Sequence, residues 1–427
     1  MSSATIVNPG APAGTRFSVG RHLSLASLWF GFNFHWLPIG FVLIQSQLRS
    51  LPDVPHAHFG EALGTMVGAG AVFAVLVPPA VGQLSDHIRT PWGRRRPVIF
   101  AATLVNLVGL GLMMTAHSYG QLFVGYLWIQ FFANASGAAY AGVIPDVVPG
   151  PEFGRASGFL AGMNQAGGLA GVLVTSVLAG LNHLTWAYAA IGVITVLAMI
   201  PALIASRGEG MGPRPERQPA PLVEAAKKFL APLWSGDFGW VIFTRMMVTA
   251  AITIVAYFLS PFFHDVVRAP NSDQFTSNWL GIVFVAAIPF GVTGGAISDR
   301  LGRKLFVYLS GAAQSLVALV FIVLYPTSIP LVIVAGGLYG IGYGLYYAVD
   351  WALACDTLPD RSRSAKDMGL FHVAQTLPQT VAPAIGGFLL DYFNSQSPNS
   401  GYRAVFGSAI VFFVLGTVFV SRIRSVR

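Results

Sequence analysis

The feature that most constrains this chain is a series of long apolar stretches that recur along its whole length. A stretch of about 20 apolar residues can cross the hydrocarbon core of a bilayer as a helix. The mean hydropathy is +0.64 and 54% of the residues are hydrophobic, which is more apolar surface than a soluble domain of 427 residues can bury. The sequence therefore predicts an all-α polytopic membrane protein.

We predict twelve membrane-spanning helices. They cover residues 22–46, 59–84, 97–116, 119–145, 156–181, 184–205, 238–263, 276–298, 304–324, 329–354, 366–391 and 402–421. The longest hydrophilic gap is rich in proline and charged residues and separates six spans from six. The predicted organisation is a cytoplasmic tail (1–21), a first half (22–205), a cytoplasmic linker (206–237), a second half (238–421) and a cytoplasmic tail (422–427).

Lysine and arginine are unevenly distributed over this map. With the N-terminus in the cytoplasm, 21 of the 25 lysines and arginines fall in cytoplasmic segments. Arg49, Arg268 and Arg403 fall outside, and Arg245 lies within a span. Cytoplasmic loops carry the excess of positive charge in membrane proteins, so we expect a cell-membrane protein with both termini in the cytoplasm. The same asymmetry accounts for the net charge of +8 without a nucleic-acid partner.

The two halves repeat short patterns at corresponding places. GQLSD at 82–86 matches GAISD at 295–299, and a Gly-Arg-basic step follows each copy. AYAGVIPDVVP at 139–149 matches VDWALACDTLP at 349–359, which aligns Asp146 with Asp356. Internal repeats of six spans joined by a long loop are typical of secondary transporters.

The repeated G-x-x-S-D loop with its Gly-Arg step resembles the signature of the major facilitator superfamily. In the first copy Asp86 is followed by Gly93-Arg94-Arg95-Arg96-Pro97, a form similar to that of the sucrose/proton symporters and, more distantly, of the glycoside–pentoside–hexuronide symporters. The resemblance implies two pseudo-symmetric six-helix halves, with spans 1, 4, 7 and 10 lining a central cavity. The fourth span departs from the sucrose symporters, because Phe131 occupies their acidic position.

Polar and aromatic residues on those four spans are the candidate substrate-binding groups. They are Asn33, His35, Gln130, Asn134, Thr249, Tyr339, Tyr343, Tyr346 and Tyr347. The tyrosines recur at helical spacing on one face of the tenth span, where their rings could stack on a sugar and their hydroxyls could bond it. Interfacial anchoring and helix packing are the alternative roles for these residues.

Arg245 and Asp350 lie at equal depth on spans 7 and 10, which suggests that they pair. We expect Asp350 to be the ion-coupling carboxylate and Arg245 to adjust its affinity for a proton. A static salt bridge within the second half is the alternative. The sequence leaves open whether the coupling ion is H⁺ or Na⁺.

Charged residues at the cytoplasmic ends of the spans form a second candidate group. The predicted cytoplasmic gate consists of Asp86, Arg94, Arg95, Asp146, Arg155, Asp299, Arg303 and Asp356. Carboxylate–guanidinium pairs suit a gate because they can break and re-form in water.

These observations favour a secondary active transporter over an enzyme. The sequence has no phosphate-binding loop, metal-ligand cluster or other catalytic motif, so we expect no cofactor and no bound metal. The predicted activity is proton-coupled symport of a sugar, such as a disaccharide or glycoside, by a monomer. A proton-driven exporter of an amphipathic small molecule and a non-transporting membrane sensor are the alternatives. The identity of the sugar and the direction of transport stay open.

Overall fold

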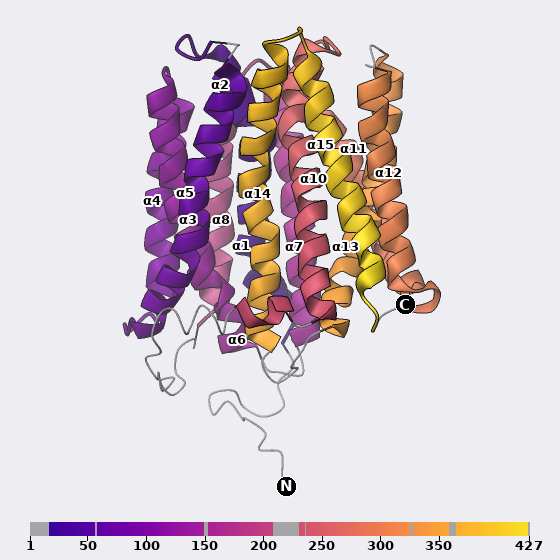
Figure 1. The fold of residues 1–427 in the computed structure, drawn as a ribbon. Coiled ribbons are helices and arrows are strands. Elements are labelled where there is room, and N and C mark those ends of the chain that lie inside the picture. Colours follow the sequence, from indigo (N-terminus) through magenta and orange to yellow (C-terminus); the bar gives the residue numbers. More distant parts are fainter. Residues whose placement is uncertain are drawn as a thin grey trace. The chain divides into compact units, whose positions relative to one another are not determined.

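The computed structural model describes residues 17–55, 58–148, 153–207, 230–234, 236–324, 328–357 and 364–425. Over these residues the chain is almost entirely helical (Figure 1). The only β-type pairing that they contain is an isolated bridge between Thr90 and Gly93, in the charged loop after the second predicted span. The all-α prediction is therefore confirmed.

Each predicted span coincides with a long helix. The first span contains α1 (Val19–Pro38), a π-helical turn η1 (Ile39–Leu43) and α2 (Ile44–Ser50). The others are α3 (Phe59–His87), α4 (Arg96–Met114), α5 (Tyr119–Ala141), α7 (Phe153–Gly180), α8 (Trp186–Ala205), α10 (Asp237–Asp265), α11 (Ser272–Leu301), α12 (Arg303–Val323), α13 (Ile329–Asp356), α14 (Ser364–Asn394) and α15 (Ser400–Val418). The short helices are α6 (Val143–Val147), η4 (Ala231–Trp234) and η6 (Phe419–Arg422).

Length and composition make membrane crossing possible for many of these helices. Among the described residues, 8 helical segments are long and apolar enough to span a membrane. Large apolar side chains such as Val72, Leu76 and Val334 are exposed on them, at 54%, 61% and 68%. Exposed apolar surface on this scale is stable in contact with lipid and would be costly in water.

The contacts divide the chain into two compact units that do not follow the order of the sequence. Unit 1 contains residues up to Leu37, Val72–Gly171 and Thr185–Gln218. Unit 2 contains Pro38–Ala71, Val172–Leu184 and the rest of the chain from Pro219. The divisions fall within α3, within α7 and between Leu37 and Pro38 at the end of α1. Parts of three helices from the predicted first half therefore pack with the predicted second half.

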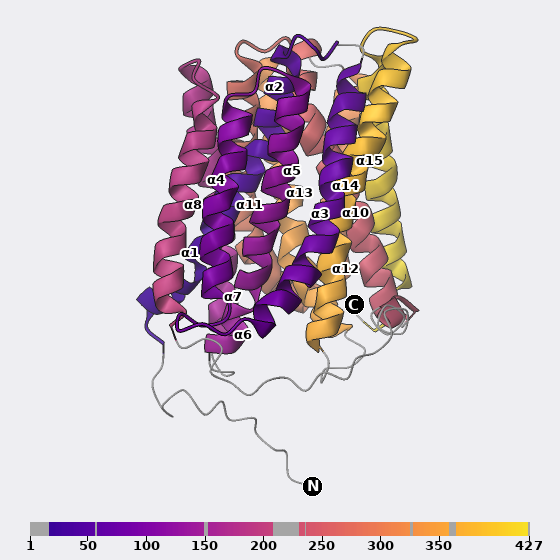
Figure 2. The same cartoon turned by 90° about the vertical axis from the view of Figure 1, so that its left-hand side faces the viewer.

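Each unit has a core of its own. In unit 1, α4 packs against both α5 and α8, and these helices lie side by side in Figure 2. In unit 2, α10 packs against α14 and α15, and α13 packs against α11 and α12. A cluster of fully buried aromatic rings holds α10, α12 and α15 together, with Phe262, Phe321 and Phe406 in mutual contact at 5.0–5.4 Å between ring centroids.

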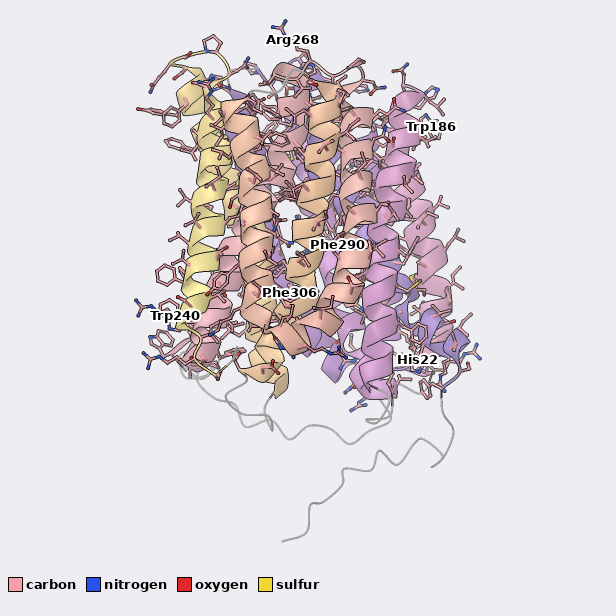
Figure 3. All side chains as sticks on the ribbon, turned by 90° about the vertical axis from the view of Figure 1, so that its right-hand side faces the viewer. His22, Trp186, Trp240, Arg268, Phe290 and Phe306 are labelled. Carbon is pink, nitrogen blue, oxygen red and sulfur yellow. The ribbon has the colours of Figure 1, made fainter. Side chains whose placement is uncertain are left out.

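Figure 3 identifies the two ends of each unit. In unit 1, His22 near the start of α1 lies at one end, and Trp186 at the start of α8 lies near the other. In unit 2, Trp240 near the start of α10 marks one end, and Arg268 beyond the end of α10 marks the other. We call the end with His22 or Trp240 the inner end of its unit and the opposite end the outer end.

Candidate functional site

A buried ion pair links α10 and α13 in unit 2. Arg245 contacts the Asp350 carboxylate through Nη1, and each side chain is only 6% exposed. Both residues lie about two helical turns from the inner end of their helices. A charged residue left unpaired in a membrane span is costly, so each partner makes the burial of the other tolerable.

A third helix, α14, also holds the Arg245 guanidinium. The Gln375 side-chain oxygen accepts a hydrogen bond of 2.7 Å from Arg245 Nη2. The guanidinium carbon lies 3.7 Å from the centre of the Phe371 ring, which is the geometry of a cation–π contact. Phe371 and Gln375 are one helical turn apart and therefore share a face of α14. Among the described residues, buried Arg245 Nε has no hydrogen-bond partner.

The tyrosines of α13 line the same region. Tyr346 and Tyr347 lie within electrostatic range of Arg245. The ring of Tyr347 also contacts that of Tyr343, with 4.6 Å between the ring centroids. Tyr339 and Tyr346 are each only 4% exposed, and their hydroxyls have no partner among the described residues. Buried hydroxyls normally find a partner, so these two are available to a bound molecule.

The remaining predicted residue of unit 2 is Thr249, one turn beyond Arg245 on α10. Its side chain is 2% exposed, and Thr253, one turn further, is 3% exposed. Helical spacing places both threonines on the face of α10 that carries Arg245. This face therefore carries two buried hydroxyls, one and two helical turns from Arg245.

In unit 1, the predicted polar residues have polar neighbours, which lie on other helices for His35 and Asn33 and on α5 itself for Gln130 and Asn134. His35 is 1% exposed, and its Nε2 lies 3.5 Å from the Asn106 amide nitrogen on α4. Asn33 donates a hydrogen bond to Asn164 on α7. Gln130 donates to the Tyr126 hydroxyl at 2.7 Å, and Asn134 donates to the Gln130 side-chain oxygen at 3.0 Å. Buried His35 Nδ1 has no partner among the described residues, so a substrate-binding role for His35 stays a prediction, and Asn33 and Asn134 are only partly buried.

An aromatic patch lies next to these residues on α3 and α5. The Phe131 ring is 38% exposed and contacts the rings of Phe73 and Phe132 at 6.0 and 4.9 Å between centroids. Phe132 also contacts Trp128 at 5.0 Å. The fourth span therefore presents an apolar surface at the position where the sucrose symporters carry an acidic residue.

At the inner end of unit 1, two arginines bind one carboxylate. Arg94 donates to both Asp146 oxygens, at 2.6 and 3.2 Å, and Arg95 Nε donates to Oδ2 at 2.7 Å. Asp146 lies on α6, and Gly142 separates α6 from α5. A β-carbon at Gly142 would overlap the Arg95 guanidinium, so glycine is what gives this arginine room.

The corresponding pair in unit 2 joins Arg303 and Asp356. Arg303 Nε donates to Asp356 Oδ2 at 2.5 Å, and the Asp356 side chain is 38% exposed. Three other predicted gate residues, Asp86, Arg155 and Asp299, have side chains outside the described part of the chain.

A second polar cluster lies at the outer end of unit 2, where the sequence analysis expected none. Arg49 of α2 donates to Asp273 of α11 at 2.6 Å and to Ser260 of α10 at 2.9 Å. Ser46 and Ser260 also donate to the Asp273 carboxylate, at 2.5 and 3.0 Å. We call Ser46, Arg49, Ser260 and Asp273 the outer cluster. It joins the first predicted span to the seventh and eighth.

Two further contacts at this end join early and late segments. Asp391 of α14 accepts hydrogen bonds from the backbone nitrogens of Gly60 and Glu61, at 3.0 and 2.6 Å, and so caps the N-terminus of α3. Ser176 of α7 donates to Asn278 of α11 at 2.5 Å. The outer cluster and these two contacts therefore all connect helices of the first six spans to helices of the last six.

The sequence carried a weak signal for the outer cluster. Arg49 is one of only three basic residues that the predicted topology places outside, and Ser46 lies one turn before it. Asp273, however, falls in a short polar loop that a sequence alone gives no reason to single out. Phe371 was missed because its contact with Arg245 depends on which helices are neighbours.

A comparison with known protein families shows the family to which this chain belongs. The family model of the Major Facilitator Superfamily matches residues 23–270 and 258–427. The chain belongs to the major facilitator superfamily. The family resemblance seen in the repeated charged loops is therefore confirmed, and the chain is a multi-pass membrane protein of a transporter family.

Curated relatives match a short part of the chain. The multidrug resistance protein MdtL of Escherichia coli (strain K12 / DH10B) is 38% identical over 103 residues, as is MdtL of Shigella boydii serotype 18. The match covers 24% of this chain and 26% of those relatives. The chain thus aligns with about a quarter of the length of these curated proteins.

Solved structures share the fold over nearly the whole chain. A crystal structure of a mutant of the nucleoside transporter NupG gives a TM-score of 0.72 at 14% identity and covers 95% of this chain and 99% of that one. A bacterial homologue of the human lysosomal transporter Spinster, in an inward-facing and unoccupied conformation, gives 0.69 at 13% identity, with 96% and 97% covered. At these identities the likeness shows the fold alone.

Proposed function

We propose that this protein is a proton-coupled symporter that works by alternating access, with Asp350 as the coupling carboxylate and Arg245 as its partner. The observation that carries the proposal is the buried Arg245–Asp350 pair inside an apolar helical bundle. Ionisable residues within membrane spans are rare and commonly mark ion pathways. We place the protein in the cell membrane with both termini in the cytoplasm, on the basis of its uneven charge distribution.

The pair can respond to a proton because its strength depends on the charge of Asp350. Protonation removes the charge attraction, and in a buried site this attraction is strong. Among the described residues, Arg245 then keeps the Gln375 hydrogen bond and the Phe371 ring. A change of this kind alters the packing of α10 against α13 and gives the proton a means to shift the conformational equilibrium.

The substrate site in this proposal lies next to the pair. The unpartnered hydroxyls of Tyr339 and Tyr346 supply hydrogen bonds, and the tyrosine rings supply flat apolar surfaces. A sugar presents hydroxyls on its edge and C–H groups on its faces, which match such a surface. These features support a sugar or glycoside as the transported molecule.

The charged clusters act as gates in the proposed cycle. Alternating access requires contacts at one end to form while those at the other end open. The Arg94–Arg95–Asp146 and Arg303–Asp356 pairs would serve at the inner end. The outer cluster would serve at the outer end, because Arg49 and Asp273 come from opposite halves of the sequence.

A second candidate function is export of an amphipathic small molecule. The 38% identity to multidrug resistance proteins and the exposed aromatic patch around Phe131 favour it. The Arg245 charge disfavours an exported cation near the ion pair, because like charges repel in a buried site. An exporter of cations would therefore use the aromatic patch of unit 1 and leave the tyrosines of unit 2 unused.

The deciding experiment measures transport in proteoliposomes with and without an inward proton gradient. Counterflow of labelled sugars first identifies a substrate, and Asp350→Asn is then compared with the wild type. We expect the variant to lose gradient-driven accumulation and to keep counterflow. Glu61→Gln, which removes an exposed carboxylate, is the matched control and should behave as the wild type. Normal proton-driven accumulation by Asp350→Asn would overturn the proposal.

A further inference from the structure

The charge of Arg245 has a consequence for the molecule that binds beside it. A guanidinium stays protonated under all physiological conditions, so proton uptake by Asp350 leaves Arg245 positively charged and without its anionic partner. Arg245 is 6% exposed, which means that water does not solvate this charge. A buried, unpaired charge is strongly unfavourable. Protonation of Asp350 therefore needs a replacement anion if it is to occur readily.

The described surroundings of Arg245 contain no such anion. Its contacts on α14 are Phe371 and Gln375, which are neutral. The nearby groups on α13 are the neutral phenols of Tyr346 and Tyr347. On its own helix, the nearest carboxylate is Asp237, about 12 Å away at 1.5 Å per residue, and its Oδ2 accepts a hydrogen bond from the Ser425 backbone. The side chains of Lys366, Asp367 and His372, all on α14, lie outside the described residues.

The same region holds hydrogen-bond donors that no described residue uses. Arg245 Nε and the hydroxyl oxygens of Tyr339 and Tyr346 are buried and have no described partner. Tyr346 precedes Asp350 by one helical turn, and Tyr339 precedes Tyr346 by two. A guanidinium N–H and a phenol O–H are donors that suit a carboxylate or phosphate oxygen. The site therefore offers the charged group of an incoming anion one positive charge and the hydrogen bonds of Arg245 and Tyr346. Tyr339 lies about 16 Å along α13 from Asp350 at 1.5 Å per residue and can meet only the far end of a larger substrate.

We infer that the substrate carries one negative charge, which takes the place of the Asp350 carboxylate on Arg245 when Asp350 accepts the proton. The inference rests on the proposed function and narrows its substrate class to small organic acids, with sugar acids as the form that also uses the tyrosines. The charges balance at each stage. The resting site holds Arg245⁺ and Asp350⁻, and the loaded site holds Arg245⁺, the substrate anion and neutral Asp350. Uptake is then electroneutral, with one proton for each anion.

The first test measures proton uptake on binding, with purified protein in weakly buffered detergent solution and a pH-sensitive dye. The probes are matched pairs that differ in charge: glucuronate against glucose, and benzoate against benzyl alcohol. We expect about one proton to be taken up per bound anion and none with the neutral partners. Binding of glucose with the same affinity as glucuronate, without preference for the anion, would contradict the inference.

The second test uses Asp350→Asn, which resembles the protonated site and leaves Arg245 without its ionic partner. We expect acetate, benzoate or glucuronate to raise the thermal stability of this variant at concentrations at least tenfold lower than for the wild type, with no dependence on pH. Asp350→Asn combined with Arg245→Gln should lose the effect, and Glu61→Gln should match the wild type. If none of the three anions stabilises this variant, the inference is overturned.

The two proposals fail in different ways. If Asp350→Asn still accumulates substrate under a proton gradient, the proposed coupling site is wrong. If Asp350→Asn abolishes coupling but neither variant nor wild type distinguishes glucuronate from glucose, coupling at Asp350 stands and the anionic substrate is wrong. Preferential stabilisation by the cation tetraphenylphosphonium would also count against an anion.

Discussion

The fourth helix of each predicted half carries the same sequence pattern at its inner end, yet the two copies make different contacts. The alignment of AYAGVIPDVVP with VDWALACDTLP places Tyr140 opposite Asp350. Tyr140 donates a hydrogen bond to the Leu25 backbone of α1, the first helix of its half. Asp350 contacts Arg245 of α10, the first helix of the other half. The residue at this aligned position thus joins the fourth helix of each half to the first helix of the same half. It does so with a neutral hydrogen bond in the first half and with an ion pair in the second.

A second difference lies two residues further on. Gly142 in the first copy aligns with Ala352 in the second. The first copy breaks after Ala141, and Arg94 and Arg95 both reach Asp146. In the second copy α13 runs unbroken to Asp356, which bonds Arg303 and is 38% exposed against 15% for Asp146. The aspartate of the first copy therefore binds two arginines at the inner end, and the second copy carries a buried carboxylate where the first has a phenol.

The largest effect should come from breaking the Arg245–Asp350 ion pair. Arg245→Leu leaves Asp350 buried without its partner, and we expect the free energy of unfolding to fall by about 3–5 kcal/mol. Thermal unfolding in detergent measures the loss. Arg245→Leu combined with Asp350→Leu replaces the pair with apolar groups and should recover most of it. Equal instability of the single and double variants would show that the charge left behind is not the cause.

The next effect separates the ion pairs of Asp146 and Asp356 at the inner ends. Asp146→Asn removes the shared acceptor of two arginines, and we expect a loss of about 2 kcal/mol because charge-assisted hydrogen bonds are lost from a mostly buried site. Asp356→Asn should cost less than about 1 kcal/mol, because exposed ion pairs contribute little. Unfolding of both variants in parallel tests the ranking, and a larger loss for Asp356→Asn would reverse it.

A smaller effect should follow from exchanging the glycine and the alanine. Gly142→Ala places a methyl group where the Arg95 guanidinium lies, and we expect about 1–2 kcal/mol of destabilisation from strain and the displaced bond. The matched change Ala352→Gly should cost only about 1 kcal/mol, the usual difference in helix propensity. If Gly142→Ala is stabilising, as helix propensity alone would predict, the role given to Gly142 is wrong.

The smallest effect should come from removing the hydroxyl of Tyr140, the residue that aligns with Asp350. Tyr140→Phe removes one buried hydrogen bond to the Leu25 backbone, and we expect a loss of about 1 kcal/mol with proton coupling unchanged. The pH dependence of uptake should therefore match that of the wild type. A shifted pH profile would mean that the two copies are less different than their contacts indicate.

The sequence predicted the helices well because apolar length determines them directly. Each predicted span coincides with a helix, and the repeated charged loops indicated the correct superfamily. The short helix α6 and the π-helical turn η1 were not foreseen, since both depend on local backbone geometry that the apolar pattern does not encode.

The site was predictable where the position of a residue along its helix carries the information. Equal depth on two helices suggested the contact of Arg245 with Asp350, and helical spacing suggested the tyrosine face. The role of Phe371 and the outer cluster require knowledge of which helices touch, which a single sequence does not supply. His35 stays a predicted substrate-binding residue, and its contact with Asn106 could not be read from its position in the span.

The π-helical turn in the first span is one reason why the outer cluster could not be predicted from the sequence. The backbone nitrogen of Ile44 bonds the oxygen of Ile39, five residues back, so the turn holds more residues than a regular helical turn. A helical wheel drawn through the whole span therefore loses phase between α1 and α2. Side chains before the turn, such as Asn33, contact unit 1, whereas Arg49 after it contacts Asp273 in unit 2. Deleting one residue from Ile39–Leu43 would restore a regular helical turn and leave Arg49 facing Asp273, because a regular turn holds about one residue fewer than a π-helical turn.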